Sequence, residues 1–224
     1  MKSLTKIALA AGLATTATAA PASAQVNGIG TSDLPIAVVG SQAFQTGYQQ
    51  IATQYQAQRT TVEQRQQQRT QLVQQLDTNG DGQLSEDEAN AAPQATVQQV
   101  QAIDQEIQQI QRPINLARIY VVQQVAQQYA PALQQVVSAQ NVQIVLTPDA
   151  IVYAPEAANL TPAVVQALNT RVPSVQITPP AGYQPSEAAV GLFQQVQQVL
   201  LMAQMQQAQQ QAQTQTQQPA TSGR

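Results

Sequence analysis

The pattern of apolar positions divides the chain into two long helical stretches on either side of a short acidic loop. Before the loop, apolar residues recur every three or four positions, which is typical of one buried face of a helix. They are Phe44, Tyr48, Ile51, Tyr55, Val62, Leu72 and Leu76. After the loop, the spacing follows a coiled-coil heptad through Val100, Ile103, Ile107, Ile110, Ile114, Ala117 and Val121, and continues through Val125, Tyr129, Leu133 and Val136. Two long helices joined by a short loop should pack antiparallel, so residues 41–140 are predicted to form a protruding helical hairpin.

Charged residues and prolines interrupt the apolar pattern of this predicted hairpin. Folding the chain about the loop brings Arg65 near Asp104 and Glu106, where the side chains can pair across a wet middle. Pro113 and Pro131 fall inside the second helical pattern, and we expect each of them to kink it.

Short apolar runs outside the hairpin predict a small sheet, and the fold class is therefore α+β. Ile36–Val39 and Val142–Leu146 have the apolar character of buried strands, Asp149–Ala154 is expected as a hairpin partner, and Val175–Ile177 as a last strand. Thr161 should begin a short helix between the last two strands. Residues 35–180 then form one domain whose body consists of strands 36–39 and 142–178. Because such strands are apolar on both faces and too few to bury themselves, we expect the body to assemble as a homotrimer.

The two ends of the chain differ in character from this domain. Residues 1–24 have the basic start, apolar run and small-residue cleavage site of a secretory signal peptide, so the mature chain is expected to begin near Ala24/Gln25, followed by a linker over 25–34. No later stretch has about 18 unbroken apolar residues, so no integral membrane segment is expected. Residues 181–224 contain an amphipathic helix over 186–213 and a glutamine-rich tail. This helix either covers the body or is a methionine-bearing contact for other chains.

Charge is scarce and localised. Charged residues make up 9 % of the chain, with nine basic and twelve acidic residues, and cysteine and histidine are absent. Loss of Lys2 and Lys6 with the signal peptide leaves seven basic residues, and five of the twelve acids lie within residues 77–88. The rest of the mature chain is neutral, so it has no basic surface for nucleic acid and no cysteine or histidine ligand for zinc.

The acidic loop DTNGDGQLSEDE, residues 77–88, fits the twelve-residue calcium loop of an EF-hand. Gly82 stands at position six, where the loop turns sharply. The predicted Ca²⁺ ligands are Asp77, Asn79, Asp81, Gln83 (through its carbonyl), Ser85 and Glu88. The alternative is a polar turn between two helices, because Asn-Gly and Asp-Gly pairs are common in turns. A single unpaired loop should bind calcium only at about 10⁻⁴–10⁻³ M, the range of extracellular modules.

The layout resembles the OmpH/Skp family of periplasmic chaperones over residues 35–169. The resemblance is carried by IAVV at 36–39 and by VQIVLTPDAIVYAPEAANLTPAVVQALN at 142–169, which is similar to the closing strands and final helix of that family. It implies a homotrimer with a small β body, whose helical tentacles enclose unfolded outer-membrane proteins in the periplasm.

Three features depart from the family pattern, and one of them is the added amphipathic helix over 186–213. Such chaperones are typically strongly basic, whereas this chain has a pI of about 4.8, so a lipopolysaccharide site is not carried over. The calcium-type loop at the tentacle tip is also foreign to the pattern.

The function predicted from these observations is that of a holdase, which binds unfolded outer-membrane proteins without ATP and is modulated by calcium. The alternative is a calcium-binding spacer protein of the cell envelope. An enzyme is not expected, because the carboxylates gather in one loop without a nucleophile or base beside them.

Overall fold

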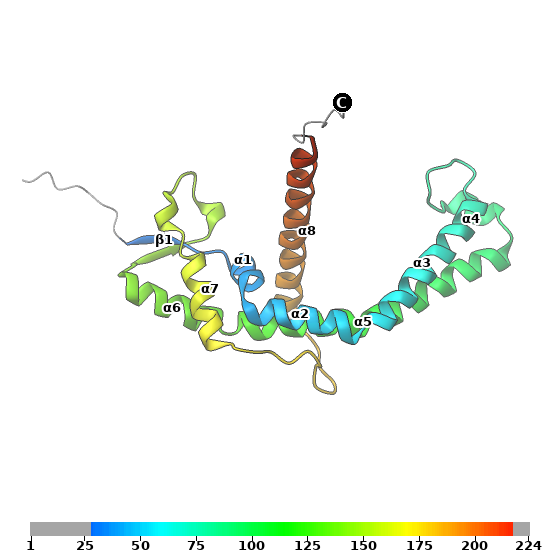
Figure 1. Cartoon of the computed structure of the whole chain (residues 1–224). Coiled ribbons are helices and arrows are strands. Elements are labelled where there is room, and N and C mark those ends of the chain that lie inside the picture. The colour runs from blue at the N-terminus through cyan, green and yellow to red at the C-terminus, as the bar shows by residue number, and fades with distance from the viewer. Residues whose placement is uncertain (1–27, 217–224) are drawn as a thin grey trace, which may run out of the picture.

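The computed structural model describes residues 28–216, with side chains described as far as Gln211. Figure 1 shows a body at one end, a long helical hairpin curving away from it, and a single helix that rises between the two. The elements in chain order are β1 (Ile29–Thr31), α1 (Leu34–Gly40), α2 (Gln42–Gln54), α3 (Gln56–Leu76), α4 (Glu86–Ala91), α5 (Gln94–Ala126), α6 (Tyr129–Gln140), β2 (Ile144–Leu146), the 3₁₀ turns η1 (Pro148–Ala150) and η2 (Glu156–Ala158), α7 (Thr161–Arg171) and α8 (Glu187–Thr216). The predicted signal peptide lies outside the described residues.

The apolar run Ile36–Val39 is helical, and its prediction as a strand was wrong. Asp33 caps α1 by accepting a hydrogen bond from the backbone N–H of Ile36 at 2.8 Å, and Pro35 occupies the first turn, where its missing N–H has no consequence. Ala37 and Val38 are fully buried because α1 packs against α5, α6, α7 and α8. A short run that is apolar on every side suits a helix surrounded by helices as well as it suits a central strand.

The sheet is smaller than predicted and is parallel. Strands β1 and β2 pair in the register Ile29↔Ile144 to Thr31↔Leu146, so the Val142–Leu146 prediction is confirmed in a shortened form. The segment expected to be its hairpin partner instead forms η1 followed by a loop in which Val152 and Tyr153 are almost fully exposed. The N-terminal strand comes from the residues that were predicted to be a linker.

The last predicted strand, Val175–Ile177, is extended chain held by a side chain instead of by another strand. The amide of Gln124 donates to the carbonyl of Gln176 at 2.8 Å and accepts from its N–H at 2.9 Å. These two bonds satisfy the backbone N–H and carbonyl of Gln176, which a neighbouring strand would otherwise pair. The segment 175–177 therefore lies against α5 without a sheet neighbour.

The body has one core, to which six helices contribute. Its centre is the inner face of α5, where Val121, Val122 and Val125 are fully buried. Around them pack Ala37, Val38, Ala43, Phe44, Ile51, Ala132, Val136, Val164, Leu168 and Val196. Val196 belongs to α8, so the C-terminal helix is seated in the same core.

The predicted antiparallel hairpin is present, formed by α3 and α5 with α4 at the tip. Arg65 pairs with Glu106 at 2.9 Å, as expected, whereas Asp104 pairs with Arg69 at 2.6 Å. Pro113 lies within α5 without ending it. The break between α5 and α6 falls at residues 127–128, four and three residues before Pro131, because a proline ring clashes with the carbonyl four residues earlier in a helix.

Candidate functional site

The tip loop between α3 and α4 is ordered by its own side chains. The Asp77 carboxylate accepts hydrogen bonds from the backbone N–H groups of Gly80 at 2.6 Å and Gly82 at 2.7 Å. Asn79 accepts from the N–H of Asp81, and Asp81 from the N–H of Gln83, each at 2.8 Å. Side-chain oxygens of three predicted calcium ligands therefore already accept hydrogen bonds from backbone N–H groups of the same loop.

Two glycines make this turn possible. Gly80 and Gly82 have φ values of 78° and 76°, in the left-handed region that residues with a side chain rarely adopt. The sequence prediction that position six of the loop needs glycine is confirmed by the backbone of Gly82.

Glu88 does not face the other carboxylates; it ties the two ends of the loop together. One of its carboxylate oxygens accepts from the N–H and hydroxyl of Thr78 at 2.7 and 2.9 Å and from the N–H of Asn79 at 3.2 Å. The other accepts from the N–H and hydroxyl of Ser85 at 3.0 and 2.9 Å, while the Ser85 hydroxyl accepts from the N–H of Glu88 in a capping box at the start of α4. Donation by the backbone N–H groups of Ser85 and Thr78, and then by their hydroxyls, lowers the pKa of Glu88 to about 2.

The hydrogen bonds within the tip loop limit which side-chain oxygens are available to bind a cation. Within residues 28–216, no group of three or more acidic side chains converges as a metal site would require. Asp77, Asn79 and Asp81 have the right oxygens for a hard cation, but Glu88 already receives five donors from the protein. In this conformation the loop fits a self-capped turn, and calcium binding remains a prediction that requires Glu88 to change partners. Thr78, which the sequence pattern did not single out, donates two of the five hydrogen bonds that Glu88 accepts.

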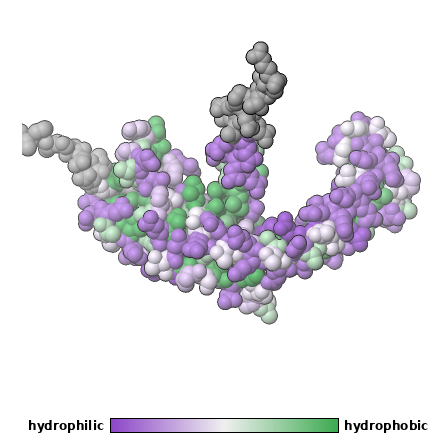
Figure 2. All heavy atoms as spheres, viewed as in Figure 1, coloured by the Kyte–Doolittle hydropathy of each residue, from purple (hydrophilic) through white to green (hydrophobic). Residues whose placement is uncertain are grey.

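Small apolar clusters stiffen the hairpin between the tip and the body. Val73, Leu76, Val97 and Val100 are buried just below the loop. Further along, a second cluster is formed by Val62, Ile103 and Ile107, with Leu72 and Ile110 packed against it. The outward faces are mostly glutamine, and Figure 2 shows hydrophilic residues covering the hairpin while apolar residues gather over the body and the base of α8.

The open side of the body carries a groove of about 1020 Å³ between the sheet and the loop that follows β2. Its lining includes Ile29, Gln143, Leu146, Ile151 and Tyr153. Ile29, Ile144, Val152 and Tyr153 are all large apolar or aromatic side chains that are exposed here. Exposed residues of this kind around a two-stranded sheet indicate an interaction surface.

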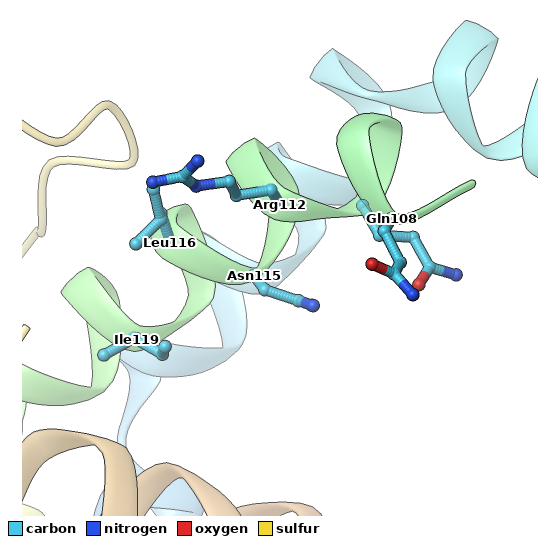
Figure 3. A pocket seen from close by; sticks show the side chains of 6 residues that line it. Gln108, Arg112, Asn115, Leu116 and Ile119 are labelled. Carbon is cyan, nitrogen blue, oxygen red and sulfur yellow. The ribbon is translucent and has the colours of Figure 1, made fainter. Parts of the chain in front are cut away.

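A second, shallower depression of about 350 Å³ runs along the outer face of α5. Figure 3 shows its labelled side chains, Gln108, Arg112, Asn115, Leu116 and Ile119, arranged along successive turns of the helix. Arg112 is the only ionisable residue in its lining, and no nucleophile or acid–base pair accompanies it. This depression has no groups for catalysis.

Comparison with known proteins settles the family. The family model described as "Outer membrane protein (OmpH-like)" matches residues 28–168, well over half of the chain. The chain belongs to the OmpH-like family. This is a family of outer-membrane-protein chaperones, not of enzymes, and its chaperones are periplasmic. The match runs from β1 into α7, so the segment after α7 and the whole of α8 lie beyond it.

Among solved structures, the OmpH-like chain is similar to a protein from Caulobacter crescentus CB15 whose description is an outer membrane chaperone, OmpH-like. The identity is 22 %, the alignment covers 66 % of this chain and 88 % of the other, and the TM-score is 0.36. A search of curated proteins gives no match. Within the described residues, none of the helices combines the length and the apolar character needed to cross a bilayer.

Proposed function

We propose that this OmpH-like protein is a periplasmic holdase that binds unfolded outer-membrane proteins without ATP. The observation that carries the proposal is the family match over residues 28–168, which contains both the body and the complete hairpin. The hairpin presents short apolar clusters between glutamine-covered faces, and its arginines at 65 and 69 are neutralised by Glu106 and Asp104. Such a surface can hold a client weakly and through many small apolar contacts.

Turbidity measurements on a urea-denatured porin test this function. On dilution of the porin from urea, the mature protein should keep it from aggregating at a comparable subunit concentration, and addition of ATP should change nothing. An inert globular protein of similar size serves as the control. If turbidity rises as fast as in the control, the holdase assignment is wrong and the spacer alternative is favoured.

The assembled form is proposed to be a homotrimer joined through the open side of the body. The supporting observations are the groove beside β2, which exposed Ile29 and Tyr153 line, and the exposed side chains of Ile144 and Val152 on β2 and the loop that follows it. In a single chain these side chains and the outer edge of the sheet meet water, and a neighbouring copy would cover them.

Light scattering of the mature protein at micromolar concentration measures the assembly directly, with three chains per particle expected. The double variant Ile144→Gln, Tyr153→Gln should form smaller particles. The control Ile36→Gln changes an equally exposed residue on α1, away from the groove, and should not affect the mass. A stable, folded monomer of the unaltered protein would exclude this assembly.

We also propose that export removes residues 1–24, so that the mature chain begins at Gln25. The basic start and apolar run of the sequence support this. Mass spectrometry of the protein purified from the periplasm should give the mass of residues 25–224, and an intact Met1 terminus would contradict it.

Calcium binding at the tip is proposed as a weak, competitive event. Asp77, Asn79 and Asp81 carry carboxylate and amide oxygens within five residues of one loop, and Glu88 would exchange its bonds to Thr78 and Ser85 for the cation. Because that exchange costs free energy, the dissociation constant should be no tighter than about 10⁻³ M. Calorimetric titration of the mature protein, beside a Glu88→Gln variant, should show heat only in the former. Equal heats, or none at several millimolar calcium, would reduce the loop to a self-capped turn.

A further inference from the structure

The C-terminal helix α8 has two halves in different surroundings. Near its start, Ala189 and Val196 are buried, and α8 packs against α1 and α5. From Leu201 to Gln211, every side chain is exposed. In Figure 1 this distal half rises on the same side of the α2–α5 stem as the tip of the hairpin, so the two projections border one concave face of the molecule.

The base of α8 is held rigidly by the segment 172–186, which we call the strap. Gln124 binds both backbone groups of Gln176, and the Tyr183 hydroxyl donates to the side chain of Gln123. The Tyr183 ring also packs edge-on against Tyr120, with 5.0 Å between ring centroids. Tyr120, Gln123 and Gln124, which lie within little more than one turn of α5, thus hold the strap at the base of α8.

The distal half carries an apolar cluster without any charge around it. Leu201, Met202 and Met205 are 56 %, 60 % and 51 % exposed, and they lie on one side of the helix because Met205 is four residues from Leu201 and three from Met202. From Ala188 to Thr216 the sequence contains no ionisable side chain, and the remaining positions are mainly glutamine. Methionine is flexible and polarisable, so it adapts to apolar partners of different shapes.

The apolar, uncharged character of Leu201, Met202, Met205 and their neighbours favours one kind of binding partner over others. A second copy of α8 would bury only three large side chains on each helix, well short of the roughly 1,000 Å² that a specific interface requires. A charged partner would find no counter-charge. An extended strand of an outer-membrane β-barrel alternates apolar and polar residues and, before it is inserted, has unpaired backbone groups. Leu201, Met202 and Met205 can take its apolar side chains. Gln206 and Gln209, each four residues after one of the methionines and so on the same side of the helix, can both donate and accept hydrogen bonds with its backbone.

We propose that one face of the distal half of α8, the face that carries Leu201, Met202 and Met205, is a docking surface for amphipathic strand segments of unfolded outer-membrane proteins. This proposal rests on the holdase function proposed above. It adds a client contact outside residues 28–168, the part of the chain that matches the family. The strap and the seat of Val196 hold the helix so that this surface borders the concave face beside the hairpin.

The test compares two triple variants of the mature full-length protein. Leu201→Gln, Met202→Gln, Met205→Gln removes the apolar cluster without adding charge. The control Gln204→Ala, Gln207→Ala, Gln211→Ala changes another face of the same helix. The probe is a fluorescently labelled porin, diluted from urea, whose affinity is measured by anisotropy. The particle mass of each variant is measured by light scattering.

We expect the first variant to bind the porin about tenfold more weakly, since several apolar contacts are lost, and the control to bind within twofold of the parent. All three proteins should have the same particle mass and helix content. Unchanged porin affinity in the first variant overturns the proposal, and so does a smaller particle mass, which would mean that the cluster joins copies of the chain. If the parent itself fails to bind porin, the holdase function fails and this inference fails with it, an outcome distinct from the other two.

Discussion

Glycine at position 47 allows α2 to approach α5 at the root of the hairpin, and its replacement should be costly. A Cβ atom placed on Gly47 would meet a methyl carbon of Val175 at 2.9 Å and two methyl carbons of Val121 at 3.2 and 3.3 Å. Val121 is fully buried in the centre of the core and cannot withdraw. At Gly191, which also lies inside a helix, no described atom lies within 4 Å of the added carbon. The two positions therefore form a matched pair.

The magnitudes follow from two opposing terms. Alanine stabilises a helix interior over glycine by about 1 kcal/mol, and this gain applies at both positions. Overpacking of a filled core typically costs about 1–3 kcal/mol, and this cost applies only at position 47. Gly47→Ala should therefore lower the free energy of unfolding by up to about 2 kcal/mol, whereas Gly191→Ala should raise it by about 0.5–1 kcal/mol.

Thermal unfolding followed by circular dichroism measures both effects, at one fixed protein concentration because assembly alters the apparent stability. For a chain of this size, about 1 kcal/mol corresponds to a shift of roughly 2–4 °C in Tm. Gly47→Ala should melt below the parent and Gly191→Ala above it. If both substitutions raise Tm by the same amount, α2 and α5 do not approach as closely as described.

Three further predictions concern the tip, the body and the client surface. Because hydrogen bonds to Glu88 lower its pKa to about 2 from an unfolded value of 4.5, its contribution to tip stability should be complete above about pH 4.5 and lost as the pH falls through 2. Hydrogen exchange at Thr78 and Ser85 should show this dependence in the parent but not in Glu88→Gln. Tyr129→Phe removes the hydroxyl that donates to buried Ser32 at 2.7 Å, so urea unfolding should show a loss of about 0.5–1.5 kcal/mol. Porin affinity should change less than tenfold between low and physiological salt, because the mature chain outside the tip loop is neutral; a larger loss would show that charge drives binding.

The helices of the hairpin were predictable because their apolar period persists over many turns, and a long period leaves little ambiguity. Ile36–Val39 was ambiguous for the opposite reason, since four apolar residues have no period. The deciding signals were Asp33 and Pro35, a helix cap and a first-turn proline. Strand β1 could not be predicted, because it is only three residues long with a glycine in the middle, too short to show an alternating pattern, and its pairing depends on β2.

The position of the tip loop between two helices was predicted from the sequence, but its hydrogen bonds were not, and its role as a calcium site stays a prediction. The spacing of Ser85 and Glu88 is that of a capping box, a local signal that competes with the calcium pattern over the same residues. Nothing in the sequence singles out Thr78 as a further hydrogen-bond donor to Glu88. The hydrogen bonds between the Gln124 side chain and the backbone of Gln176 could not be predicted either. The sequence contains many glutamines, and only the fold places this one beside Gln176.

The parallel pairing of β1 with β2 has a consequence for how the chain reaches its folded state. Ile29 pairs with Ile144, so the whole hairpin lies between the two partners of the sheet. Closing so long a loop from an unfolded chain is slow, but a helical hairpin that forms first by local contacts brings its own ends together. We expect pulse-labelling hydrogen exchange to show protection in α3 and α5 before it appears in β1, and simultaneous protection would contradict this order. Until α5 and β2 are in place, β1 has no partner strand, so the incompletely folded chain exposes unpaired backbone groups that another extended chain could bind.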